Sequence, residues 1–214
     1  MAMLVKWILC DVRREKRTLF SRAQTSWNAL RYIEGFLGQV GGWNVNRPWE
    51  ACVMGFWKDS QSFQRFMIDF HDRIFEGSAQ AETYDSIRIA LSLKVEEMKG
   101  EEKNLYTALR QGEFLRVSDM ATRVGGDLNV AKEQREVWNP ALSNAQGMLR
   151  GIFSRELEHR ERYLVTSIWQ DESSLQGFHD QQIPRLRERL DYRRDLEQFV
   201  SRTVRLNSRW RVLP

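Results

Sequence analysis

Hydrophobic and polar side chains alternate most regularly between residues 87 and 96. A period of two predicts a β-strand with one buried face and one face toward water. Segments 4–12, 36–44 and 51–57 are short, apolar and rich in β-formers, so each is also a predicted strand. The predicted buried face of segment 87–96 consists of Ile87, Ile89, Leu91, Leu93 and Val95.

In two segments between these strands, apolar residues recur every three to four positions. This spacing predicts two amphipathic helices. The first helix runs from about residue 20 to residue 33, and Gly35 ends it. The second follows segment 51–57, where Asp59 or Ser60 can cap its first turn. The first half of the chain is therefore predicted to run β-α-β-β-α-β. The apolar positions are Phe20, Ala23, Trp27, Leu30 and Ile33 in the first helix, and Phe63, Phe66, Met67, Phe70 and Ile74 in the second.

The second half repeats this order of elements at a nearly constant offset. Trp57 recurs as Trp169 (169 − 57 = 112), and Gln24 recurs as Gln134 (134 − 24 = 110). A period near 110 residues is too long for a solenoid repeat, so we interpret it as domain duplication. The offset of 112 residues also relates Asp59 to Asp171, Ser62 to Ser174 and Phe66 to Phe178. The predicted strands of this half are 114–124, 148–155, 163–169 and 199–206, and its predicted helices are 131–144, 172–182 and 184–197.

A charged segment, 96–103, lies between the two copies and marks their boundary. We expect a first domain at residues 1–99, a linker at 100–112 and a second domain at 113–214. A chain of 214 residues has room for two such domains of about 100 residues each.

Composition and charge exclude several classes of protein. The net charge of +4 is spread along the chain, and the basic segment 185–194 also carries acidic residues. We interpret that segment as a solvated helix face and expect no nucleic-acid partner. No apolar run is long enough to span a bilayer, so no membrane partner is expected, and the lack of an export signal predicts a cytoplasmic protein. Cys10 and Cys52 lie in apolar segments and are expected to be buried thiols.

One stretch carries a resemblance to a known family. It begins Gly55-Phe56-Trp57-Lys58-Asp59-Ser60 and continues with Phe63, Phe66 and His71. A strand that ends in Trp, an acidic turn and a helix with an aromatic residue and then a His resemble the antibiotic-biosynthesis and haem-degrading monooxygenases of the dimeric α/β-barrel superfamily. The resemblance implies an α+β fold of two tandem ferredoxin-like domains that form an internal pseudo-dimer within one chain. A further homodimer stays open.

The same resemblance implies a cavity between sheet and helices in each half. Members of the group bind haem, quinols or polyketide-like aromatics there, and some oxidise them without a bound cofactor. The haem-degrading branch places an Asn on the first strand, which segments 4–12 and 114–124 lack, and a Trp where this chain has Phe66 and Phe178. Haem degradation is therefore not carried over. We expect a monooxygenase-like protein that binds a hydrophobic, aromatic or haem-like small molecule, with no cofactor required and haem as an option. The alternative is a non-catalytic binding or interaction module.

Candidate site residues follow from position in these elements. His71 falls at the edge of an apolar helix stripe, where it is either a catalytic or haem-ligating group or a partly exposed histidine near a helix end. His179 directly follows Phe178 and is a candidate for the second cavity. The three histidines have no metal-site spacing, so no metal centre is expected. The other cavity candidates are Trp57, Trp169, Phe66, Phe178, Gln24 and Gln134, where each Trp is alternatively core filling and each Gln alternatively a backbone partner.

Overall fold

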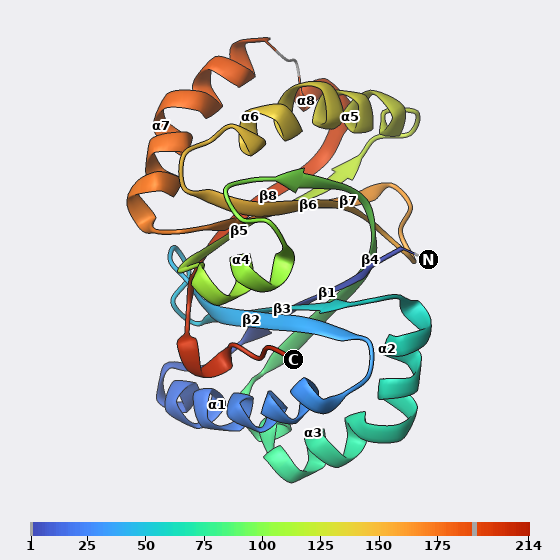
Figure 1. Ribbon diagram of the computed structural model, residues 1–214, viewed down its shortest axis with the longest axis vertical. Helices are drawn as coiled ribbons and strands as arrows, with labels where there is room; N and C mark the ends of the chain where they lie inside the picture. Colours follow the sequence, from blue (N-terminus) through green and yellow to red (C-terminus); the bar gives the residue numbers. More distant parts are fainter. Residues whose placement is uncertain (1, 190–191) are drawn as a thin grey trace. The chain divides into compact units, whose positions relative to one another are not determined.

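The computed structural model describes residues 2–189 and 192–214 (Figure 1). The chain divides into two compact units. Unit 1 comprises Met1–Leu93 and Val204–Pro214, and unit 2 comprises Lys94–Thr203. Two long strands, β4 (Ser86–Lys99) and β8 (Leu196–Leu206), contribute residues to both units. Both units combine antiparallel strands with helices, so the predicted α+β class is confirmed.

The sheet of unit 1 contains β1 (Leu4–Asp11), β2 (Phe36–Asn44) and β3 (Glu50–Trp57). β3 pairs antiparallel with β1 and β2, β1 pairs with β4, and β2 pairs with the end of β8. The order is thus β4-β1-β3-β2-β8. These pairings confirm the predicted strands of the first half.

The helices of unit 1 cover one face of this sheet (Figure 1). They are α1 (Arg17–Gln24), α2 (Ser60–Phe66) and α3 (Asp72–Ser78). The predicted helix 20–33 is α-helical only as far as Gln24 and continues as a 3₁₀ segment, Thr25–Tyr32. A π-helical turn, Met67–His71, joins α2 to α3. The prediction that Ile87 and Ile89 are buried is wrong, because 41% and 52% of their surfaces are exposed beside a cavity that they help to line.

Unit 2 has a sheet order of β8-β5-β7-β6-β4. Its own strands are β5 (Phe114–Thr122), β6 (Met148–Glu156) and β7 (Arg162–Trp169), and β7 pairs antiparallel with both others. Its helices are α4 (Leu105–Gln111), α5 (Asp127–Glu133), α6 (Asn139–Ser143), α7 (Glu172–Arg189) and α8 (Tyr192–Asp195), with a π-helical turn at Gln134–Trp138.

Two helix predictions for the second half are corrected. Pro184 does not start a separate helix but lies inside α7, which continues to Arg189. The predicted helix 184–197 also includes residues 190 and 191, which lie outside the described residues. A proline inside a helix removes one N–H donor and either kinks the helix or ends it, and here the helix continues. The predicted linker 100–112 also contains the short helix α4, which Asn104 caps through a bond from Thr107 N.

In each unit the glycine before the second strand lies against the start of the helix that follows the third strand, and this corner has the same geometry in both units. Gly35 has φ of +81° and Gly147 has φ of +73°, a region that favours glycine. A Cβ on Gly35 would lie 2.3 Å from Ser62 Oγ, and a Cβ on Gly147 would lie 2.3 Å from Ser174 Oγ. A side chain is therefore excluded at both corners for two reasons, backbone strain and direct overlap.

The same corners carry the predicted helix caps. Asp59 Oδ1 accepts a hydrogen bond from Ser62 N at 2.8 Å, and Asp171 Oδ1 accepts one from Ser174 N at 2.8 Å. These bonds lower the pKa of both carboxyls, because they favour the charged form. The capping interpretation of Asp59 and Asp171 is confirmed.

Candidate functional site

Unit 1 contains a cavity between its sheet and its helices. The cavity has a volume of about 670 Å³, its open mouth included. Its residues come from all four strands that begin in this unit, from α1, α2 and α3, from the π-helical turn, and from the 3₁₀ segments Thr25–Tyr32 and Gln80–Thr83. The aromatic walls are formed by Phe20, Trp27, Trp57, Phe66, Phe75 and Tyr84.

A lysine enters this cavity from the first strand. Lys6 shares the helix-facing side of β1 with Ile8 and Cys10, which also line the cavity. Burial lowers the pKa of Lys6 to about 8, because a charged ammonium loses its hydration. Its Nζ lies 5.3 Å from the ring centroid of Phe63, and no hydrogen bond or ion pair joins it to another described residue. Sequence reasoning missed Lys6, although a single lysine inside the apolar segment LVKWILCDV was a usable signal.

A gap in the middle strand lies beside Lys6. Gly55 on β3 is paired with Lys6 on one side and with Gln39 of β2 on the other. A Cβ on Gly55 would meet only Trp57 Nε1 at 3.9 Å and Lys6 Cβ at 4.0 Å, so the space above it is open. Gln39 is buried, lines the cavity and leaves its Nε2 without a partner among the described residues. The row therefore presents an ammonium, a gap and an amide donor to the cavity.

Gln24 belongs to a chain of side-chain hydrogen bonds in the cavity wall. Its Oε1 accepts from Gln80 Nε2 at 2.7 Å, and Gln80 Oε1 accepts from Trp27 Nε1 at 2.7 Å. A side chain from the segment after α3 thus satisfies the oxygen of Gln24, while Gln24 lines the cavity and its contact with a ligand stays a prediction. The chain fixes the orientation of the Trp27 ring in the wall.

His71 lies in the π-helical turn and lines the same cavity, with 20% of its side chain exposed. Its Nδ1 lies 2.8 Å from Asp72 Oδ1. The imidazole packs among Trp27, Phe66 and Phe75 with ring centroids 5.6, 5.8 and 5.8 Å away. Asp72 thus occupies one ring nitrogen, and Nε2 is the atom that can act on a ligand.

Trp57 and Phe66 are both core and wall. Their rings stack with centroids 4.8 Å apart, and the edge of Trp57 also meets Phe36 and Phe63. Both line the cavity, so Trp57 fills the core and also forms part of the wall, and its contact with a ligand stays a prediction. The structure brings Trp57, Phe66, Gln24 and His71 to one cavity.

Unit 2 has a cavity of about 580 Å³ in the same position between sheet and helices, lined in part by Arg116, Gln134 and Trp138. Gln134 is buried and donates from Nε2 to Asn139 Oδ1 at 2.7 Å. Trp169 and Phe178 pack on each other with centroids 5.3 Å apart and belong to the core, not to the lining. His179 is 60% exposed with Nδ1 3.0 Å from Asp180, because it points outward from α7, and it does not line this cavity.

Metal and thiol chemistry have little support in the described ranges. They contain no cluster of three His, Cys, Asp or Glu side chains that could hold a metal ion. Cys10 and Cys52 are buried thiols, as expected. Burial, reinforced by the charge of Asp11, raises the pKa of Cys10 to about 12, so its thiol stays protonated at neutral pH. No helix in the described parts of the chain is long and apolar enough to cross a membrane.

The fold is shared with several solved structures of low sequence identity to this chain. It is similar to the structure named "Putative monooxygenase" from Fusobacterium nucleatum, with a TM-score of 0.77 and 10% identity, covering 96% of this chain and 92% of that one. An anthrone oxidase-like protein gives a TM-score of 0.71 at 12% identity, and the match covers 96% of this chain and 91% of that one. A chlorite dismutase variant from Candidatus Nitrospira defluvii gives a TM-score of 0.64 at 9% identity, and the match covers 97% of this chain and 92% of that one.

Sequence comparison identifies the family. Residues 4–92 match Domain of unknown function (DUF4937). Over 91 residues the chain is 33% identical to the Uncharacterized protein YdbC of Bacillus subtilis (strain 168), a match that covers 42% of this chain and 76% of that protein. The chain therefore belongs to this family. The matched residues all lie in unit 1, the unit with the aromatic cavity.

Proposed function

We propose that this protein is a monooxygenase-like small-molecule protein whose unit 1 cavity binds a hydrophobic, flat aromatic ligand that carries an oxygen at one end. The row Lys6, Gly55 and Gln39 is the observation that carries this proposal. An ammonium and an amide donor flank a position without a side chain, and neither has a partner among the described residues. A phenol, enol or carbonyl oxygen placed over Gly55 would satisfy both groups.

The walls of the cavity support a flat ligand. Trp27, Phe66 and Phe75 offer ring faces and edges, and aromatic pairs favour offset or edge contacts with planar molecules. Ile87 and Ile89, exposed at the cavity, supply apolar surface that a ligand would cover. Two structural neighbours are named "putative monooxygenase" and one is named an anthrone oxidase-like protein, and these names support this ligand class.

Haem is the less favoured ligand. An axial haem ligand needs open space in front of its free nitrogen, whereas the His71 imidazole is packed among three aromatic rings. This packing fits a wall residue better than an axial haem ligand. A haemin titration of the wild type and His71→Ala, followed by the Soret band, tests the point. A saturable shift that is lost in the variant would replace the aromatic ligand by haem.

Filling the gap at Gly55 is expected to abolish binding. We expect 1,8-dihydroxyanthraquinone, a planar phenol, to bind the wild type saturably and Gly55→Val at least about tenfold more weakly. A Cβ at Gly55 makes only ordinary contacts, so we expect the variant to fold. Absorbance of the dye measures both affinities.

The matched control is Gly77→Val, the same substitution on α3, where a Cβ would meet nothing within 4 Å. Equal dye affinity in Gly55→Val and Gly77→Val would contradict a site over Gly55. Absence of saturable binding to the wild type would contradict the aromatic ligand class.

Oxygen uptake separates an enzyme from a binding module. Anthrone plus O₂ gives anthraquinone plus water, a balanced reaction that needs no other reductant or cofactor. If the protein catalyses such a step, His71 is the proposed proton-transfer group through Nε2, since Nδ1 is held by Asp72. Protein-dependent uptake that falls in His71→Ala would favour the monooxygenase. Dye binding without uptake would favour the alternative, a binding or interaction module.

We infer, in addition, that the chain is a tandem duplication of a ferredoxin-like domain that acts as an internal pseudo-dimer, with domains at 1–99 and 113–214. Supporting this inference, Gly35 and Gly147 form equivalent corners, 112 residues apart. The row Lys6, Gly55, Gln39 also has a counterpart in Arg116, Ser167 and Gly151, which are paired in the same way across β5, β7 and β6. Expression of residues 113–214 alone, followed by a cooperative unfolding transition, would test it.

A further inference from the structure

A buried arginine lines the unit 2 cavity. Arg116 lies on β5 directly opposite Ser167 of β7, and only 9% of its surface is exposed. It faces the cavity together with Gln134 and Trp138. No hydrogen bond or ion pair joins Arg116 to another residue in the described part of the chain.

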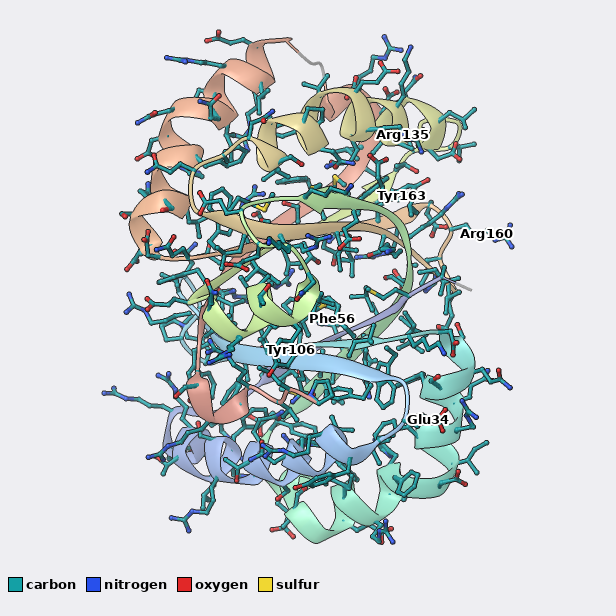
Figure 2. The ribbon with its side chains drawn as sticks, viewed as in Figure 1. Glu34, Phe56, Tyr106, Arg135, Arg160 and Tyr163 are labelled. Carbon is teal, nitrogen blue, oxygen red and sulfur yellow. The ribbon has the colours of Figure 1, made fainter. Side chains whose placement is uncertain are left out.

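Three other unit 2 arginines, Arg135, Arg150 and Arg162, are paired with carboxylates. Arg162 Nη2 lies 2.7 Å from Asp119 Oδ1, and Arg150 pairs with Glu97. Arg135 Nε lies 3.0 Å from Glu96 Oε2 of β4, and Figure 2 labels Arg135 among the helices of the unit. Arg116 differs from these arginines in being both buried and unmatched.

The charge of Arg116 persists at neutral pH. Burial, and then the positive charge of Arg187, lower its pKa to about 10, which still leaves the guanidinium protonated at pH 7. Glu133 also lines the cavity, but no ion pair links it to Arg116. An unpaired buried charge is unfavourable unless an anion compensates it. The missing group is thus an anion that enters from outside the chain.

We propose that the unit 2 cavity binds a small apolar carboxylic acid as its carboxylate, with the carboxylate on Arg116. A guanidinium presents two parallel N–H donors that match the two oxygens of a carboxylate. Most of the remaining lining is apolar, with walls from Val130, Trp138, Leu142, Val165, Ile183 and Leu196, whereas Ser118, Glu133, Gln134 and Arg187 are its polar members. This site is separate from the aromatic site of unit 1, because none of its residues lines that cavity.

The test uses 2-naphthoate as the probe and 2-naphthamide as its neutral analogue, with calorimetric titration of the full chain. We expect saturable binding of 2-naphthoate to the wild type. Arg116→Met is expected to weaken it about 10- to 100-fold, the range for loss of charge-assisted hydrogen bonds. The amide is expected to bind the wild type as weakly as the acid binds the variant. Arg116→Met removes a buried charge, so it is expected to fold.

The matched control is Arg135→Met, which changes the same residue type in the same unit outside the cavity lining. It is expected to bind 2-naphthoate like the wild type. Equal affinity of Arg116→Met and the wild type would overturn the proposal, as would equal affinity for acid and amide. Weakening by Gly55→Val instead of Arg116→Met would place the acid in unit 1 and overturn it too.

Discussion

Trp57→Ala is expected to lower the free energy of unfolding by about 3–5 kcal/mol, the range for removal of a fully packed large aromatic side chain. Trp57 is 2% exposed, and its ring contacts Phe36, Phe63 and Phe66 with centroids 4.8–5.6 Å away. Alanine cannot fill that space, and the three phenylalanines come from a strand and a helix that cannot all collapse inward. Chemical denaturation, followed by circular dichroism, measures the loss.

The control is Trp49→Ala, because Trp49 is 49% exposed at the surface of unit 1. It is expected to change the unfolding free energy by less than about 1 kcal/mol. Trp169→Ala is the counterpart in unit 2, and it also removes the hydrogen bond that Nε1 donates to Ser167 Oγ at 2.9 Å. We therefore expect it to lower the free energy of unfolding at least as much as Trp57→Ala. A Trp57→Ala protein as stable as Trp49→Ala would show that the ring does not hold this core together.

The strands and caps could be predicted because local rules decide them. Alternation and β-branched content located β1, β3 and β7, and the pattern Trp-x-Asp located both capped corners. The prediction for Ile87 and Ile89 failed for a physical reason. Alternation identifies the side of the sheet on which a side chain lies, but not whether the helices on that side close over it, and here they leave a cavity.

The cavity chemistry could be predicted only in part. His71, Phe66 and Trp57 were found because helix spacing and the repeated motif place them on one face. Lys6 and Arg116 were missed, since a cation in a strand usually extends to water, and only the packed structure shows that Arg116 is buried and Lys6 partly buried. His179 was placed wrongly because residues one apart on a helix face different directions, so it cannot share the side of Phe178.

Lys6→Met is expected to raise the free energy of unfolding at pH 7 by up to about 3 kcal/mol, an unusual gain from one substitution. Burial lowers the pKa of Lys6 from 10.5 to about 8, a difference of 10.5 − 8 = 2.5 pH units. Each unit corresponds to about 1.4 kcal/mol of preference for the neutral amine in the folded state. Methionine has a similar shape without the charge, so the variant does not bear this penalty below pH 8.

The pH dependence identifies the cause of that gain. Between pH 8 and 10.5 the unfolded chain holds the Lys6 proton and the folded chain has lost it, so wild-type stability rises with pH in this window. The advantage of Lys6→Met is therefore expected to be full at pH 7 and to vanish near pH 10.5, whereas the exposed Lys58→Met is expected to show no such trend. Urea unfolding across this range measures it. A gain that stays constant with pH would assign the effect to packing, and no gain at pH 7 would mean that the ammonium reaches water.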